Sequence, residues 1–224
     1  MPVHHLSDEL LLDHAAGSLP EPVALLVATH LALCPTCREN ETSLEAIGGV
    51  LLDEIEPEAM EGGGIDALFA RIEAGSAETS EADATAGTAI KPVTSDTRPS
   101  LPRPLRDYVG GEVDALAWRK RGKLSEARLL PGAKGGTVKL LRIPAGAMMP
   151  VHTHRGTELT LVLEGGFSDE RGHYLRGDVA IADEDVTHRP RADDDGDCLC
   201  LAVTEAPVQL AGPLARFLNP FLRD

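Results

Sequence analysis

Two groups of side chains in this sequence have spacings that suit metal coordination. The first group contains His30, Cys34 and Cys37. His30 and Cys34 are four residues apart, so they share one face of a helix, and two residues separate Cys34 from Cys37. Two thiolates and an imidazole suit Zn²⁺, which takes four ligands in a structural site. His4 and His5, near the N-terminus, are the candidates for the fourth ligand.

The Cys34–Cys37 spacing also occurs in thioredoxin-like redox pairs. Such a pair follows a strand in an α/β pattern, whereas the residues before Cys34 have helical periodicity. The sequence therefore favours zinc over a redox-only pair. We expect His14 to be an ordinary surface or core histidine.

The second group contains His152, His154, Glu158 and His188. His152 and His154 alternate onto one face of an expected strand, and Glu158 follows a short turn later. Three neutral imidazoles and one carboxylate suit Zn, Fe(II), Mn or Ni. We expect a second metal site here; histidines without a function in a metal-free barrel are the alternative.

Cys198 and Cys200 are two residues apart in an apolar run and therefore share one face of an expected strand. Small buried hydrophobic residues are the first interpretation of this pair. A redox pair near the second metal site is the alternative.

Helices are expected to position the first group. Ser7 can cap a short helix through Leu10 to Ala16, and Pro35 predicts a helix break at Cys34 with a new helix behind it. Three apolar faces have helical spacing: Val23, Leu26, Val27, His30, Leu31 and Cys34; Leu44, Ile47, Leu51 and Ile55; and Ile65, Leu68, Phe69 and Ile72.

Short β-rich runs separated by Gly, Pro and Asp are expected to position the second group. They are Thr137 to Ile143, Glu158 to Leu163, Gly177 to Ala182 and Cys198 to Thr204. The fold class is therefore α+β with two domains: a small all-α helical domain at residues 1–75 and an all-β barrel at residues 101–224. Residues 76–100, rich in Ser, Thr, Ala and acids, are expected to form a flexible linker.

The formal net charge of −15 makes direct binding to nucleic acid or to an anionic membrane unfavourable. The charge is concentrated in residues 1–75, which hold 14 acidic and two basic residues, whereas residues 101–224 hold 18 acidic and 17 basic ones. No stretch is long and apolar enough for a membrane span, and acids stand where a signal peptide would carry lysines. We therefore expect a cytoplasmic protein.

The run His30-x3-Cys34-x2-Cys37, with an upstream histidine and short helices, resembles the zinc-containing domain of bacterial anti-sigma factors. The resemblance implies that His5 is the fourth zinc ligand, with the adjacent His4 as the alternative. It also implies that this domain binds a sigma factor.

The second group lies in a pattern that resembles the first cupin motif at every position: Gly146-x5-His152-x-His154-x3-Glu158-x6-Gly165. The second cupin motif matches at Gly177 and His188. It departs from the usual residues at Asp183, Asp185 and Ala192, which puts the turn before His188 in question but not the barrel.

The combination of the two halves resembles the ChrR class of anti-sigma factors over nearly the whole chain. The resemblance implies a cytoplasmic inhibitor of a group IV (extracytoplasmic-function) sigma factor, with zinc in the first domain. A second divalent metal, with zinc preferred to Fe, Mn or Ni, would occupy the cupin domain. That domain would be needed for release by an oxidative signal such as singlet oxygen.

This resemblance implies a sensor without catalytic residues. The alternative is a metal-dependent cupin enzyme, an Fe(II) dioxygenase or isomerase, with a regulatory zinc domain. Arg155 and Glu164, which lie near the second group in sequence, are the residues that such an enzyme could add.

Overall fold

The computed structural model describes residues 1–58, 64–78, 101–130, 136–206 and 208–210. It divides into two compact units, of which one contains Met1–Gly48 together with Pro99–Asp224 and the other is Gly49–Arg98. Residues 1–48 thus share a unit with the C-terminal strands, whereas the sequence analysis placed residues 1–75 in a separate domain. Most of the expected linker, residues 79–100, lies outside the described residues.

The helices begin and end close to the expected positions. They are α1 (Asp8–Ala15), α2 (Glu21–Leu31), α3 (Pro35–Asp53), α4 (Gly64–Glu78), α5 (Arg103–Val109) and the 3-10 helix η1 (Val113–Ala115). Ser7 caps α1, since its side chain accepts a hydrogen bond from the Leu10 N–H at 3.3 Å. The expected break at Cys34 is present, because α2 ends at Leu31 and α3 starts at Pro35.

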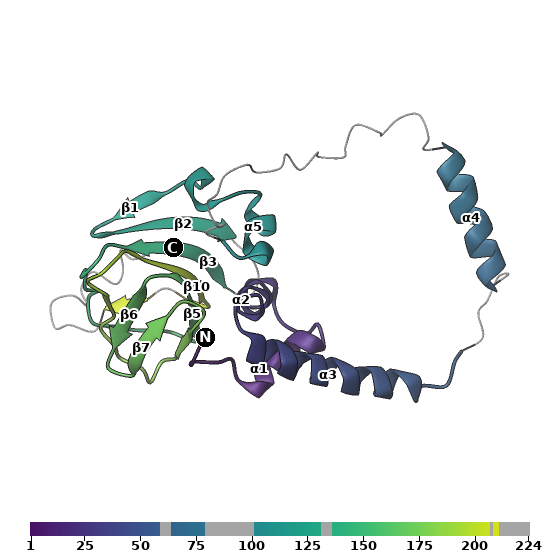
Figure 1. Cartoon of the computed structure of the whole chain (residues 1–224), viewed down its shortest axis with the longest axis horizontal. Helices are drawn as coiled ribbons and strands as arrows, with labels where there is room; N and C mark the ends of the chain where they lie inside the picture. The colour runs from purple at the N-terminus through teal and green to yellow at the C-terminus, as the bar shows by residue number, and fades with distance from the viewer. Residues whose placement is uncertain (59–63, 79–100, 131–135, 207, 211–224) are drawn as a thin grey trace. The chain divides into compact units, whose positions relative to one another are not determined.

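Eleven strands are present among the described residues. They are β1 (Arg119–Arg121), β2 (Leu124–Leu130), β3 (Thr137–Ile143), β4 (His152–Thr153), β5 (Glu158–Glu164), β6 (Gly166–Asp169), β7 (Gly172–Leu175), β8 (Val179–Ala182), β9 (Arg191–Ala192), β10 (Cys198–Thr204) and β11 (Gln209–Leu210). They form a six-stranded sheet in the order β1-β2-β3-β10-β5-β8, a three-stranded sheet β7-β6-β9 and a two-stranded sheet β11-β4 (Figure 1). Every strand pair is antiparallel.

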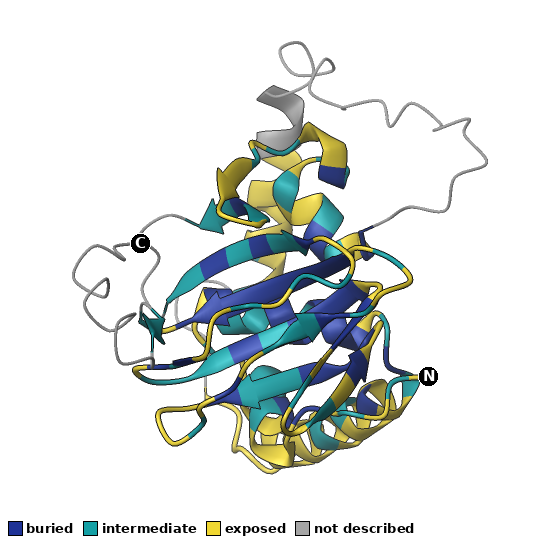
Figure 2. Cartoon of the chain, turned by 90° about the vertical axis from the view of Figure 1, so that its left-hand side faces the viewer, coloured by how far each residue is buried: buried dark blue, intermediate teal, exposed yellow. Residues whose placement is uncertain are grey.

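The six-stranded sheet is buried on both of its faces near β10. All seven residues of β10 are buried, and Figure 2 shows dark blue positions along the strands of this sheet. Leu199, Leu201 and Val203 belong to a core that also contains residues of α1, α2 and α5. Cys198 and Cys200 belong to a second core, inside the barrel. One face of the sheet therefore packs on helices, and the other face lines the barrel.

Helices α2 and α5 both contribute leucines to the first core. Leu26 of α2 and Leu105 of α5 are fully buried in it. The helices also meet each other at a hydrogen bond of 2.6 Å, which the Tyr108 hydroxyl donates to Glu21. Among the described residues, no helix is long and apolar enough to cross a membrane.

Candidate metal centres

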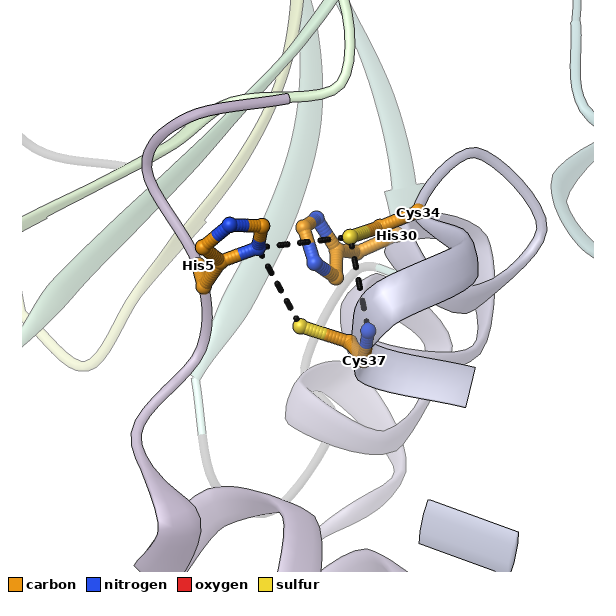
Figure 3. A group of neighbouring side chains, drawn as sticks. All are labelled: His5, His30, Cys34 and Cys37. Atoms are coloured by element: carbon orange, nitrogen blue, oxygen red, sulfur yellow. Dashed lines mark hydrogen bonds between the residues drawn. The ribbon is translucent and has the colours of Figure 1, made fainter. Parts of the chain in front are cut away.

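The N-terminal site is the group formed by His5, His30, Cys34 and Cys37. Each of the four offers one ligand atom, and these atoms lie within 4.8 Å of one another. His5 comes from the segment before α1, His30 from the last turn of α2, Cys34 from the helix junction and Cys37 from the first turn of α3 (Figure 3). The Nδ1 atom of His5 is 3.3 Å from the Cys34 sulfur and 3.5 Å from the Cys37 sulfur.

The ring of His30 is oriented by the barrel. Its Nδ1 donates a hydrogen bond to the Gly177 carbonyl at 2.8 Å. Burial lowers the pKa of His30 below its usual value, which keeps the imidazole neutral. The buried Nε2 atom of this ring has no hydrogen-bond partner among the described residues, so its lone pair is free to bind a metal.

The thiols of the N-terminal site are buried, and no disulfide is present among the described residues. Burial raises the pKa of the Cys37 thiol to about 11, and a hydrogen bond with Cys34 adds to this shift. A metal ion would be needed to hold such a thiol as a thiolate near neutral pH. The donor set therefore fits a soft or borderline ion such as Zn²⁺.

The structure places His5 in the N-terminal site and His4 outside it. The His4 ring lies 4.5 Å from the Tyr174 ring, and its Nε2 is 3.2 Å from the His173 carbonyl oxygen. His14 is also elsewhere, and its Nδ1 atom is in hydrogen-bond contact with the Glu41 carboxylate.

The barrel site is the group formed by His152, His154, Glu158 and His188, whose ligand atoms also lie within 4.8 Å of one another. The Nε2 atom of His188 is 3.0 Å from that of His152 and 3.1 Å from that of His154. Zn–N bonds of about 2.0–2.1 Å place neighbouring ligand nitrogens about 3.0–3.4 Å apart, so these distances match the edges of a coordination polyhedron.

Two hydrogen bonds outside the barrel site orient its histidines. His188 Nδ1 lies 2.8 Å from a carboxylate oxygen of Asp169 in β6, and His152 Nδ1 lies 2.8 Å from the Pro150 carbonyl. Because both partners accept a hydrogen bond, a neutral ring at either position carries its proton on Nδ1 and turns its Nε2 lone pair towards the group. Burial lowers the pKa of His152, and it lowers the pKa of His154 to about 4, so these imidazoles are neutral.

The carboxyl group of Glu158 lies beside these rings, and its side chain is 14% exposed. Its Oε2 atom is 3.6 Å from His154 Nδ1, and Thr160 Oγ1 lies 3.3 Å from its Oε1. Burial raises the pKa of Glu158, although the His188 and Lys139 charges oppose this shift. A divalent cation in the group would instead favour the ionised carboxylate.

A cavity of about 480 Å³ lies in the barrel beside this group. Its lining includes three of the proposed ligands, apolar residues such as Leu141 and Phe167, and the basic residues Arg128 and Lys139. Arg155 and Glu164 are not among the described residues that line it.

The sequence analysis did not single out Asp169, Arg128 or Lys139. The alternation of β3 could have placed Lys139 on the inner face with Leu141 and Ile143. No sequence signal links Asp169 to His188, because the contact joins residues from two separate turns.

Cys198 and Cys200 lie on the inner face of β10, with their sulfur atoms 3.3 Å apart. Both side chains are buried, and Cys200 lines the cavity. The hydrogen bond with Cys198, together with burial, raises the pKa of the Cys200 thiol. These contacts make the pair part of the apolar barrel core, and protonated Cys200 is a poor nucleophile.

The comparisons with known proteins agree with this architecture. Residues 107–208 match a family described as the ChrR Cupin-like domain. The anti-sigma-E factor ChrR of Cereibacter sphaeroides is 40% identical over 220 residues, which cover 98% of this chain and 98% of ChrR. A chain in the crystal structure of Rhodobacter sphaeroides SigE in complex with the anti-sigma ChrR aligns with a TM-score of 0.75 at 38% identity, covering 91% of this chain and 100% of that chain. The expected order of N-terminal helices and a cupin-like barrel is thus confirmed, and the chain belongs to the ChrR family of anti-sigma factors.

Proposed function

We propose that this protein is an anti-sigma factor that binds a group IV (extracytoplasmic-function) sigma factor and blocks transcription until an oxidative signal such as singlet oxygen releases it. The observation that carries the proposal is the similarity to ChrR along 98% of both chains, together with the fold match to a solved SigE–ChrR complex. Because a sigma factor acts on RNA polymerase, the proposed site of action is the cytoplasm.

Two exposed apolar surfaces support a protein partner. On the second half of α3, Ile47, Val50 and Leu51 are each more than half exposed. On α4, Ile65, Leu68 and Phe69 form a second face at helical spacing, and each is about half exposed or more. Exposed apolar side chains grouped on one face are typical of surfaces that bind another protein.

The charge of the N-terminal part suits the same partner. The formal charge of residues 1–75 is −12, with 14 acidic and two basic residues. A sigma factor binds DNA and therefore carries basic surfaces. Opposite charge would speed the encounter and favour this class of partner.

The donor sets suggest the metals. The N-terminal site, with two thiolates and two imidazoles, would hold Zn²⁺ as a structural ion. The barrel site would hold a second divalent ion, zinc in preference to Fe, Mn or Ni. In this proposal the metals join the chain segments that carry their ligands, and no residue has a catalytic role.

A cupin enzyme is the second candidate function, and the cavity favours it. A space of about 480 Å³ with basic residues beside a histidine and carboxylate group could accept a small substrate. The substrate would bind near Lys139 and Arg128, and the N-terminal helices would then be regulatory.

One experiment separates the two functions. Metal content would be measured for the wild-type protein, His30→Ala and His152→Ala, and each would be tested for inhibition of transcription by RNA polymerase with a purified group IV sigma factor. Two zinc ions in the wild type, with inhibition lost in His30→Ala, would support the anti-sigma function. Iron in the barrel, oxygen consumption and no inhibition would support the enzyme.

A further inference from the structure

The first residues of the chain are bound to the barrel by their backbone. We define the N-terminal strap as residues Pro2–His5. The N–H groups of Val3 and His4 donate hydrogen bonds to one carboxylate oxygen of Asp178, at 2.6 and 2.9 Å. The Val179 N–H donates to the His4 carbonyl at 3.2 Å. The strap, which carries His5, is therefore held through both its N–H groups and a carbonyl group by Asp178 and Val179, at the start of β8.

Gly177, in the same turn, contacts the strap and the N-terminal site. Its φ angle is +92°, and a Cβ atom there would lie 2.6 Å from the Cγ atom of Pro2. Its carbonyl accepts the hydrogen bond from His30 Nδ1 at 2.8 Å. One barrel turn thus determines the position of His5 through the strap and the orientation of His30 directly.

The β6–β7 hairpin joins this arrangement to the barrel site. At its turn, one oxygen of Asp169 accepts hydrogen bonds from the N–H groups of Arg171 and Gly172, at 2.9 and 3.2 Å. The other oxygen accepts from His188 Nδ1 at 2.8 Å. The next strand, β7, presents Tyr174 to the ring of His4 at a centroid distance of 4.5 Å.

We propose that the segment Asp169–Asp178 is a positioning element shared by the two metal sites, so that metal in the barrel site slows the loss of metal from the N-terminal site. The inference rests on the proposed metal sites but not on sigma-factor binding. Its physical basis is a set of direct contacts: His188 to Asp169, the paired hairpin, Tyr174 to His4, and Asp178 to the strap. A change in the barrel site alters the contacts that hold His5 in the N-terminal site, and a change in the strap alters the contacts that hold His188. Thermodynamic linkage makes the coupling between the two metal affinities reciprocal.

Asp178 is the contact best suited to a test. Burial by itself would raise the pKa of this carboxyl group, but the N–H groups of His4, Leu175 and Val3 outweigh burial and hold the pKa below its usual value. The side chain is therefore a carboxylate that accepts several charge-assisted hydrogen bonds. Asp178→Asn keeps the size of the side chain and removes the charge, so it weakens the strap contact with little change in packing.

The test uses the full chain loaded with Co²⁺, because only the N-terminal site has cysteine ligands and gives a thiolate-to-cobalt absorption band. The decay of this band after addition of a chelator reports metal loss from that site alone. We expect Asp178→Asn to lose the band about tenfold faster than the wild type. Asp197→Asn is the matched control, since Asp197 accepts a hydrogen bond from the Ala145 N–H at 3.1 Å and neither residue belongs to the strap or to the segment Asp169–Asp178.

The coupling between the sites is tested by emptying the barrel site with His152→Ala, which leaves the hairpin and strap residues unchanged. We expect the cobalt band to decay at least fivefold faster than in the wild type. Equal decay rates in the wild type, Asp178→Asn and His152→Ala would overturn the proposal.

Hydrogen exchange of the wild-type chain keeps the proposal testable even if a variant does not fold. Metal added to the metal-free protein should slow exchange in peptides covering residues 2–5 and 172–179, the two sides of the strap contact. No difference between the metal-free and loaded protein in these peptides would contradict a shared positioning element. Transcription assays are not needed, so this result is independent of the proposed anti-sigma function.

Discussion

The Nε2 atoms of His152 and His188 lie 3.0 Å apart, and both side chains are buried. The Nδ1 atom of each ring lies 2.8 Å from an oxygen acceptor, which is the Pro150 carbonyl for His152 and the Asp169 carboxylate for His188. Neutral rings with their protons on Nδ1 direct two Nε2 lone pairs into the same buried group. The proposed metal ion would bind both lone pairs and so make this contact favourable.

Asp169→Asn should weaken metal binding in the barrel site. The amide can present its oxygen to His188 but loses the negative charge that orients the ring and increases its basicity. Replacement of such a partner typically lowers metal affinity by 10- to 100-fold. Titration with a competing chelator would measure the change. Asp197→Asn is the control, because Asp197 binds the Ala145 N–H and both residues lie outside the Asp169–Asp178 segment, and an equal loss in that variant would contradict a specific role for Asp169.

The sequence predicted the local features of both sites because they depend on short spacings. The break at Pro35 and the four-residue step from His30 to Cys34 were enough to predict that three of the proposed N-terminal ligands lie together. The motif from Gly146 to Gly165 placed His152, His154 and Glu158 in the barrel. The resemblance to the zinc domain selected His5 over His4, and the structure places His5 in the group.

The packing of the helices on the barrel was not predicted, and the reason is physical. The contact between His30 and Gly177 joins residues 147 positions apart, and no periodicity encodes such a pair. One signal was present in β10, where an uninterrupted apolar run indicates a strand that is buried on both faces. A solvent-facing sheet would instead show polar residues at Leu199 and Leu201.

Cys34→Ser should abolish stable metal binding at the N-terminal site. Serine is a poor ligand for zinc, and three remaining ligands leave the ion incompletely coordinated. We expect one metal ion fewer per chain and loss of the thiolate-to-cobalt band in the cobalt-loaded protein. Cys198→Ala should keep that band, since Cys198 is buried in the barrel core. Retention of the band in Cys34→Ser would show that Cys34 is not a ligand.

Binding of the proposed sigma factor should weaken as salt is added. The charge of −12 on residues 1–75 attracts a basic partner over a distance that salt shortens, from a Debye length of about 10 Å at 0.1 M to about 3 Å at 1 M. The association rate should fall more steeply than the dissociation rate rises. Surface plasmon resonance over a range of salt concentrations would measure both rates. An association rate that does not depend on salt would rule out electrostatic steering.

The apolar faces of α3 and α4 should contribute to partner binding without contributing to the stability of the free protein. Leu51 and Leu68 are about half exposed or more, so replacing either by Asp removes little buried area from the fold. A charge placed in an apolar interface loses its water on binding, and each variant should weaken the complex by about 2 kcal/mol or more, roughly 30-fold in Kd.

Leu11→Ala is the contrasting variant for these faces, because Leu11 is fully buried in the first core. It should lower the free energy of unfolding by about 2–5 kcal/mol, whereas Leu51→Asp and Leu68→Asp should leave the melting temperature nearly unchanged. Thermal unfolding and sigma-factor affinity would be measured on all three proteins. If Leu51→Asp and Leu68→Asp bind the partner as tightly as the wild type, these faces do not form the interface, and the acidic surface would have to supply the binding energy alone.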